Sequence, residues 1–404
     1  MSPLIALGLV LVVLVILVRL KLELGWSMLI CAVALGLLSR LGPAKIARIL
    51  GAAWWNGDAF NLAVSLVSIL FLENIMRKNG YLQRVHLSLR ALCGDSRAVM
   101  ALGPAFLGLL PSPGGAVFSA PMVEEAAAGM GLTAEDKSVI NYWYRHIWEC
   151  SLPLYPGVIL AAKIFQVPAG RLTLYQIPFT ALAVFLGVLI AFRHTRRGQV
   201  AAVDATKRRS YLDLAIGVAP VLAVLLMVLV FGAEVWLAVV GIVLVLLALH
   251  RYKVRRLLDL CRESFSWRPI LLVAGIMAFR FMLGTTGVVE ALPKLFTGMG
   301  LPPVALVVLL PLTLAVLIGI GQGFVSASFP LLVGIVGLGA EANMGYIAVA
   351  YISGLTGMML TPLHLCLVLT VQFYRADLGQ VWRRIAPAMA VMLALAIPYG
   401  FWLF

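Results

Sequence analysis

The sequence predicts an all-α membrane protein with ten transmembrane spans and two re-entrant helical hairpins, arranged as two inverted repeats. Composition is the first reason: 62% of the 404 residues are hydrophobic, only 12% are charged, and the mean hydropathy is +1.03. Soluble domains are about 45–50% apolar and about 25% charged, so lipid must be the solvent for much of this chain. Long apolar runs and an internal repeat are the other two reasons.

The net charge of +14 predicts basic loops at a membrane surface, because Lys and Arg accumulate in cytoplasmic loops. We expect no nucleic-acid partner. The cysteines form no C-x-x-C pair, which indicates neither a disulfide framework nor a zinc site; they are Cys31, Cys93, Cys150, Cys261 and Cys366. The sequence contains no G-x-S-x-G, H-E-x-x-H or P-loop motif. We therefore expect a protein that is not an enzyme, without catalytic residue, metal site or cofactor, except sodium or a proton as coupling ion.

Eight apolar runs approach the length of about 20 residues that a helix needs to cross the hydrocarbon core. Two further segments, 134–166 and 343–373, are long enough but are interrupted at 151–156 and 357–362, where prolines disfavour helix. Exposed main chain at membrane depth survives only where it is buried in protein or lines a wet cavity. The interruptions therefore indicate a site. The uninterrupted runs are 3–19, 24–39, 59–76, 176–192, 212–231, 234–250, 268–284 and 384–402.

Two other apolar segments are broken too centrally to cross. Residues 98–130 carry prolines and glycines at 111–115, and residues 302–338 carry a glycine-rich tip at 319–323. Each arm has about 14 residues and rises about 21 Å, which is short of the roughly 30 Å of hydrocarbon. We expect re-entrant hairpins that enter and leave on the same face.

The distribution of basic residues agrees with ten crossings. With alternating sides, 23 of the 31 Lys and Arg residues fall on one side and 6 on the other, and only Arg145 and Arg280 fall within spans. Positive charge marks the cytoplasmic side. We therefore expect a multi-pass protein of the cell inner membrane, with both termini on the outer (periplasmic) side.

An internal repeat relates the two halves. A shift of 209 residues places Pro121 on Pro330 and Pro178 on Pro387. Each half has five predicted crossings, an odd number, so the second half must be upside down relative to the first. Inverted repeats with interrupted helices that meet near the midplane are an architecture of secondary transporters.

This repeat predicts the division of the chain. The first repeat is 1–198, a basic cytoplasmic linker is 199–211, and the second repeat is 212–404. Each repeat contains scaffold spans, a hairpin, an interrupted helix and a last span; the ranges are 3–76, 98–130, 134–166 and 176–192 in the first, and 212–284, 302–338, 343–373 and 384–402 in the second. The stretches 43–57 and 252–266 are amphipathic, which indicates interfacial helices, with simple surface linkers as the alternative.

The helix before the first interruption is unusually polar for membrane depth. Asn141, Arg145 and Glu149 share one face, and His146 lies on the neighbouring stripe. Ionisable groups inside a span usually face a cavity or a partner. We expect Arg145 to hold the negative charge of a solute, and Glu149 to pair with it or to carry a coupling cation. A structural Arg145–Glu149 pair and a packing role for His146 are the alternatives.

Small and polar residues gather at the tips and interruptions. Glycines let main chain approach a ligand closely, helix N-termini offer N–H groups to an anion, and freed carbonyls can coordinate sodium. Plain turn chemistry is the alternative for any single residue. The predicted substrate-binding residues are Ser112, Pro113, Gly114, Gly115, Asn141, Arg145, Tyr155, Gln322, Gly323, Ser326, Ser328, Thr361 and His364; the predicted coupling-ion residues are Glu149, Ser151 and His146.

Two stretches carry a family resemblance: LLPSPGGAVFSAPMVEE at 109–125 and NYWYRHIWECSLPLYPG at 141–157. They resemble the signatures of a prokaryotic integral membrane family catalogued as domain of unknown function 401. That family is similar to the ion-transporter superfamily of arsenite permeases, TRAP large permeases, citrate carriers and divalent anion symporters. The resemblance implies an elevator mechanism, in which hairpins and interrupted helices slide across a scaffold that is often dimerised. The Ser-Asn-Thr sodium motif of the divalent anion symporters is missing from both tips, which weakens the case for sodium coupling and dicarboxylate specificity.

Together these patterns predict a homodimeric secondary transporter of a small anionic solute, an organic anion or an oxyanion, coupled to protons or sodium. One alternative is a protein that flips an anionic lipid headgroup, for which we expect a groove open to lipid beside the tips. Another is a non-transporting scaffold or receptor, in which the interrupted helices would pack without a cavity.

Overall fold

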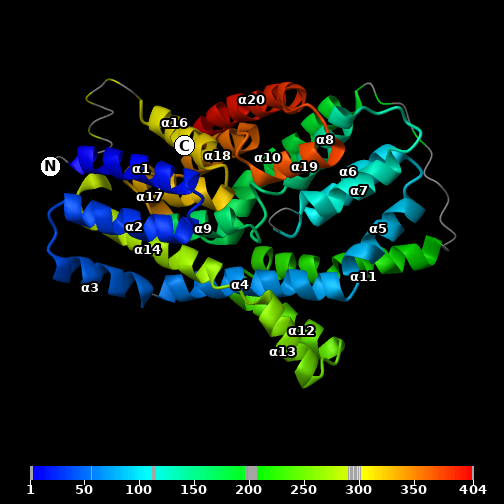
Figure 1. Ribbon diagram of the computed structural model, residues 1–404, viewed down its shortest axis with the longest axis horizontal. Helices are drawn as coiled ribbons and strands as arrows, with labels where there is room; N and C mark the ends of the chain where they lie inside the picture. Colours follow the sequence, from blue (N-terminus) through cyan, green and yellow to red (C-terminus); the bar gives the residue numbers. More distant parts are fainter. Residues whose placement is uncertain are drawn as a thin grey trace.

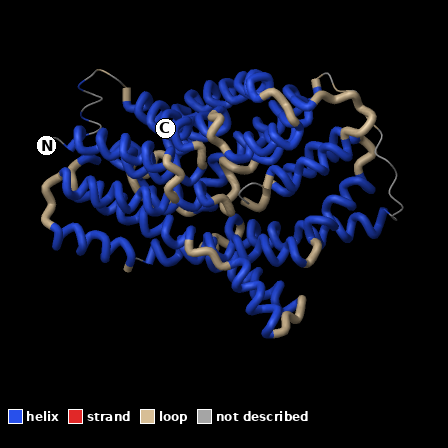
Figure 2. The backbone as a smooth tube through the Cα atoms, viewed as in Figure 1, coloured by secondary structure: helices blue, strands red, loops and turns tan. Residues whose placement is uncertain are grey.

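The computed structural model describes residues 3–55, 57–111, 115–193, 207–289 and 302–402, together with residues 195, 198, 291, 294, 298 and 300. Throughout these residues the chain forms helices joined by turns and loops, without a strand (Figure 2). The predicted all-α class is therefore confirmed.

The first half contains ten helices among its described residues (Figure 1). They are α1 Pro3–Arg19, α2 Leu24–Leu38, α3 Pro43–Trp54, α4 Gly57–Lys78, α5 Tyr81–Leu92, α6 Ser96–Leu107, α7 Ala116–Ala126, α8 Ala134–His146, α9 Pro156–Phe165 and α10 Ala169–Phe192. The second half follows the same order. Its described helices are α11 Lys207–Leu229, α12 Val235–Leu249, α13 Val254–Ser264, α14 Arg268–Thr285, α16 Pro303–Ile318, α17 Gly321–Val336, the short 3-10 helix η1 Gly339–Glu341, α18 Met344–Leu360, α19 Leu365–Tyr374 and α20 Leu378–Trp402.

Six of the described helical segments are long and apolar enough to cross a membrane. They are α4, α10, α11, α14, the interrupted pair α18–α19, and α20. Helices α1, α2 and α12 are equally apolar but have only 17, 15 and 15 residues. The protein is therefore built as a multi-pass membrane protein, while the full count of ten crossings stays a prediction.

The helix boundaries of the two halves correspond closely. Helices α9 and α19 have ten residues each and begin at Pro156 and Leu365, which are 209 positions apart. Helices α10 and α20 begin at Ala169 and Leu378, with the same separation. The sequence repeat therefore corresponds to a repeat of helical elements.

Helix contacts between the two halves occur in pairs, in which the second contact joins the equivalent helices with the halves exchanged. The outgoing arm of the first hairpin, α7, packs on α19 of the second half, and α17 packs on α9 of the first half. Likewise α2 packs on α14, and α4 packs on α12. In Figure 1 these segments, far apart in sequence, interleave along the length of the molecule. Neither half forms a separate domain.

Several boundaries differ from the sequence predictions. Helices α10 and α20 begin at Ala169 and Leu378, seven and six residues before the predicted starts at 176 and 384. Helix α8 ends at His146, five residues before the predicted interruption at 151–156, and α18 continues through Gly357 to Leu360. Helix α5 was not predicted at all; it is amphipathic and buries Tyr81, Val85 and Leu89. Helix α11 begins at Lys207, inside the predicted linker 199–211, whose remaining residues lie outside the described part of the chain.

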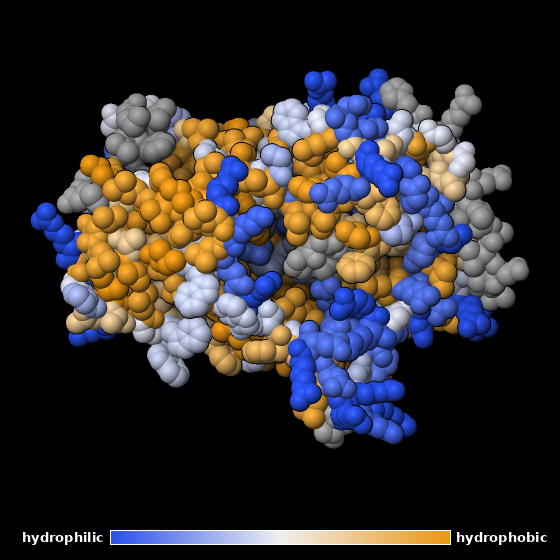
Figure 3. Space-filling view, in the orientation of Figure 1, coloured by the Kyte–Doolittle hydropathy of each residue, from blue (hydrophilic) through white to orange (hydrophobic). Residues whose placement is uncertain are grey.

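The surface separates apolar from polar regions. Figure 3 shows hydrophobic residues across much of the visible face, and hydrophilic residues gathered over the α13 region and along the end of the molecule where α5 and α11 lie. The predicted stretches 43–57 and 252–266 form helices α3 and α13. Helix α13 exposes Leu258 beside its basic residues, as an interfacial helix does.

Candidate functional site at the two helix interruptions

The first interruption runs from Ile147 to Tyr155, between α8 and α9. A capping box starts α8: the Thr133 hydroxyl accepts from the Asp136 amide, and the Asp136 carboxylate accepts from the Thr133 amide. The predicted interruption was placed too late, because tertiary bonds take residues after His146 out of the helix. The Trp148 indole donates to the Ala105 carbonyl at 2.8 Å.

The second interruption runs from Thr361 to His364, between α18 and α19. The predicted start at 357 was wrong, since Gly357 is helical and serves close packing: an added Cβ would lie 2.4 Å from the Leu312 carbonyl oxygen. The last two carbonyl groups of α18 accept hydrogen bonds from side chains. Tyr142 donates to the Met359 carbonyl at 3.1 Å, and Trp382 donates to the Leu360 carbonyl at 2.9 Å.

The two interruptions meet at a pair of histidines. His146 ends α8, His364 precedes α19, and their Nε2 atoms are 3.1 Å apart. Both side chains are buried, with 7% and 8% exposure. The Tyr142 ring packs against both imidazoles. The structure therefore brings together two predicted site residues from opposite halves of the chain.

Each interruption also binds the tip of the hairpin in its own half. The Tyr155 hydroxyl donates to the Gly108 carbonyl at 2.6 Å, and His364 Nδ1 donates to the Gly319 carbonyl at 2.9 Å. The main chain at Gly108 also lies directly against α8, since an added Cβ would be 2.2 Å from the Arg145 carbonyl oxygen. Among the described residues, each interruption is therefore bonded to the glycine that caps the incoming arm of the hairpin in its own half.

Glu149 belongs to the first interruption, and its side chain lies against the second hairpin. Its Oε1 atom would be 3.0 Å from a Cβ on Gly321, the first residue of α17. A carboxylate is stabilised at a helix N-terminus, where N–H groups and the positive end of the helix dipole lie. Tyr351 donates to the Glu149 carbonyl at 3.2 Å, and the side chain is 13% exposed, so the carboxylate is largely enclosed.

Arg145 is buried at 4% exposure on the same segment. Its guanidinium is close enough to the Glu149 carboxyl group for the two to interact electrostatically. Because burying an arginine is costly without compensation, an anionic neighbour is expected. The structure thus contains a buried arginine and a largely enclosed carboxyl group close together, which is compatible with both the structural and the ligand-binding interpretation.

Asn141 ties three elements together. Its Nδ2 atom donates to the Ala116 carbonyl on α7 and to Thr370 Oγ1 on α19, at 3.0 and 3.3 Å. Its Oδ1 atom is buried and has no partner among the described residues. Ser151 bonds Thr180 of α10 at 2.6 Å through their hydroxyls, so its side chain is already engaged with a neighbouring helix.

The structure describes most of the predicted residues at the tips and interruptions, but not all of them. Ser326 and Ser328 are buried and bond to carbonyls of their own helix, Gly323 and Phe324, at 2.9 and 2.6 Å. Gln322 is partly buried in the first turn of α17. Gly115 caps α7, and the Thr361 hydroxyl donates to the Val316 carbonyl of α16 at 2.7 Å. Ser112, Pro113 and Gly114 lie outside the described residues.

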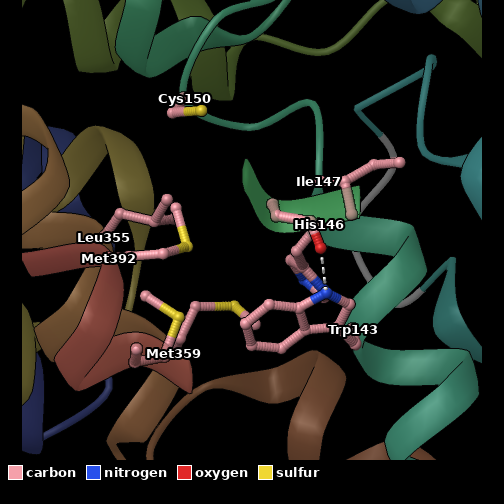
Figure 4. Close-up of a pocket in the computed structure, with 9 residues that line it drawn as sticks. Trp143, His146, Ile147, Cys150, Leu355, Met359 and Met392 are labelled. Carbon is pink, nitrogen blue, oxygen red and sulfur yellow. Dashed lines mark hydrogen bonds between the residues drawn. The ribbon is translucent and has the colours of Figure 1, made fainter. Parts of the chain in front are cut away.

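Two hollows differ in size and place. A cavity of about 10 Å³ beside the histidines has room for about one water. Figure 4 shows Trp143 and His146 of α8 on one side of it, with Leu355, Met359 and Met392 across it. A much larger apolar groove of about 740 Å³ lies among α3, α4 and α12, and none of the described residues of the tips and interruptions lines it. Beside His146 the described residues therefore leave no space for a solute larger than water.

Three residues of this site are not among those predicted from the sequence. Cys366, in the first turn of α19, lies so close to the two histidines that the three ligand atoms are all within 4.8 Å of one another. Tyr142 and Tyr351 enclose the histidines and Glu149. The aromatic residues had no sequence signal beyond apolar helix, and the five scattered cysteines gave no spacing that singled out Cys366.

Comparison with known proteins places the chain in a family. The model of the family described as "Protein of unknown function (DUF401)" matches residues 1–401. The chain belongs to the DUF401 family. No curated protein matches this DUF401 member. Among solved structures it is similar to the YdaH transporter of Alcanivorax borkumensis, whose crystal structure "reveals an unusual topology", with a TM-score of 0.59, 18% identity and 86% of each chain covered. The two proteins share a fold.

Proposed function

We propose that this DUF401 member is a secondary active transporter that moves a small anionic solute across the cell inner membrane. A gradient of protons or sodium drives it, and the hairpins and interrupted helices slide as one body against the scaffold helices. The observation that carries this proposal is the buried polar cluster of Arg145, Glu149, His146 and His364, located where the two interruptions meet and where they bond to Gly108 and Gly319 at the ends of the incoming hairpin arms. Ionisable groups in such a place are costly and typically functional.

Anion recognition would use the positive groups of this cluster. Arg145 offers a guanidinium, whose planar fork suits carboxylates and oxyanions. Helices α9, α17 and α19 all begin at the site, and their N-termini favour negative charge. Glu149 is the buried carboxylate nearest to these groups and is our candidate for the coupling cation. The lack of space for a solute among the described residues beside His146 corresponds to an occluded state, from which the hairpins must separate to admit a solute.

Two further observations support the transporter architecture. The shared fold with a YdaH transporter gives a precedent for transport on this scaffold. The exchanged helix contacts, α7 on α19 and α17 on α9, are the pattern that a two-fold axis between the repeats would produce, as in inverted-repeat transporters. The lipid-flipping alternative gains no support from the large groove, since it is lined by none of the tip residues that the structure describes.

Uptake into proteoliposomes tests the proposal. A panel of organic anions and oxyanions is offered with a sodium gradient, a pH gradient or neither, and we expect one anion class to accumulate only with one gradient. Glu149→Gln should abolish or uncouple accumulation, whereas Glu341→Gln, an exposed control, should not. Coupled uptake by Glu149→Gln would remove Glu149 from the mechanism. Absence of gradient-driven uptake for the whole panel would contradict the transport proposal.

A further inference from the structure

In the buried cluster the Nε2 atoms of His146 and His364 face each other, and neither histidine can donate to the other while both are neutral. His146 Nδ1 is 2.6 Å from the Tyr142 carbonyl oxygen, and His364 Nδ1 is 2.9 Å from the Gly319 carbonyl oxygen. A carbonyl only accepts, so both Nδ1 atoms carry the hydrogen. In neutral histidine the other nitrogen is then a bare acceptor. Two Nε2 lone pairs therefore point at each other across 3.1 Å, and a cation between them resolves the conflict.

We propose that His146, His364 and Cys366 bind a transition-metal ion of the zinc class. The three ligand atoms lie within 4.8 Å of one another. Zinc bonds of about 2.0 Å to nitrogen at a tetrahedral angle place two nitrogens about 3.3 Å apart, close to the observed 3.1 Å. A zinc–sulfur bond of about 2.3 Å places sulfur and nitrogen about 3.5 Å apart, so the Cys366 thiolate must approach the nitrogens by at most about 1.3 Å from the 4.8 Å limit. Two imidazoles and a thiolate are a donor set that zinc and cobalt accept well.

The surroundings are those of a metal site. Metal-binding histidines almost always donate their second ring nitrogen to a carbonyl or carboxylate, which fixes the tautomer and the ring orientation. Both histidines do so here, to Tyr142 and Gly319. All three ligands are at most 9% exposed, so water competes poorly. The carboxylate of Glu149, 3.8 Å from His146 Nε2, borders the position that three protein ligands leave open.

The bound ion would join the two halves of the protein. His146 belongs to α8, whereas His364 and Cys366 flank the start of α19, so coordination clamps one interruption to the other. His364 also holds the second hairpin through Gly319. The inference does not depend on which solute is transported, or on transport itself, because metal binding can be measured on the purified protein alone.

Cobalt titration of the full-length protein tests this site. The protein is purified in detergent through a tag without histidine, stripped with a chelator and titrated with Co²⁺. We expect one Co²⁺ per chain, a near-ultraviolet charge-transfer band from thiolate to cobalt, and strong visible bands of tetrahedral cobalt. Zn²⁺ should displace Co²⁺, because it binds such sites more tightly.

Variants locate the ion. Cys366→Ser should lose the charge-transfer band. His146→Gln or His364→Gln should weaken Co²⁺ binding by more than about tenfold, because even the loss of a residue that only hydrogen-bonds to a metal ligand lowers metal affinity by about 10–100-fold. Cys150→Ser, which alters a buried cysteine bonded to Thr180, and His86→Gln should keep the wild-type spectrum. A wild-type protein that shows no thiolate band overturns the proposal without any variant. A band that survives Cys366→Ser, or disappears in Cys150→Ser, overturns it as well.

Discussion

Tyr155 and His364 occupy equivalent positions in the two halves and make equivalent bonds. Each is the N-cap residue of the short helix after an interruption, α9 or α19. Each donates from its side chain to the carbonyl of the glycine that caps the incoming hairpin arm, Gly108 after α6 and Gly319 after α16. The repeat thus preserves a contact between interruption and tip, although the donor is a phenol in one half and an imidazole in the other.

Tyr155→Phe should destabilise the first hairpin. The change leaves the Gly108 carbonyl without its donor in a buried place, which costs about 1–3 kcal/mol. We expect a lower unfolding temperature, measured by tryptophan fluorescence in detergent. Tyr211→Phe is the control, because that side chain is 62% exposed and should change little. Equal stability of the two variants would show that the Tyr155 bond contributes nothing measurable.

Gly108→Ala should disturb the contact between hairpin and helix α8. The added methyl would lie 2.2 Å from the Arg145 carbonyl oxygen, so main chain must move, and such overpacking costs about 1–3 kcal/mol. Gly241→Ala on α12 is the control, since nothing lies within 4 Å of its Cβ position and alanine favours helix by about 0.5–1 kcal/mol. In the same unfolding measurement, Gly108→Ala should lower the unfolding temperature and Gly241→Ala should raise it. A Gly108→Ala protein as stable as wild type would contradict the close packing.

Arg145→Lys should weaken solute binding while preserving the charge. Lysine replaces a bidentate fork by a point charge, and loss of a charge-assisted bond of about 1.5–3 kcal/mol raises KM for the transported anion by at least about tenfold. Arg280→Lys is the matched control, because Arg280 is the other arginine predicted within a span and it binds the Lys163 carbonyl instead. An unchanged KM in Arg145→Lys would assign Arg145 to structure.

Reporter fusions should locate both halves relative to the membrane. A fusion of alkaline phosphatase after the last residue should be active and a fluorescent-protein fusion dark, because we expect the C-terminus in the periplasm. Truncation fusions within 199–211 should give the opposite result, since basic loops stay in the cytoplasm. The same reporter result at both positions would exclude an odd number of crossings in the second half and, with it, the inverted arrangement.

The sequence predicted the elements better than their boundaries. Pro156 and Pro362 mark both interruptions, since proline removes a donor and restricts the residue before it. Yet the first interruption begins at Ile147, because Trp148 and Tyr351 form bonds with main chain elsewhere. Such long-range bonds leave no local pattern. The misplaced start at Gly357 has a related cause, since that glycine serves helix packing against α16.

The candidate site was predicted in part. Polar residues at membrane depth identified Arg145, His146 and Glu149, and the repeat identified His364. Their mutual geometry depends on how the two interrupted helices cross, so the pairing of His146 with His364, 218 residues apart, could not be predicted. Cys366 was missed for the same reason. Ser326 and Ser328 were predicted as substrate-binding residues. In the structure their hydroxyls donate to carbonyls of their own helix.

The exchanged packing of α7 on α19 and of α17 on α9 constrains the order of biosynthesis. The first hairpin is synthesised long before α19, the helix against which α7 packs. Until α19 is made, the N-terminal half lies in the bilayer without this packing partner. The closing step of assembly belongs to the last helices made. Each half expressed alone should therefore fail to reach its folded structure. Two halves translated separately in the same cell should assemble into the folded protein.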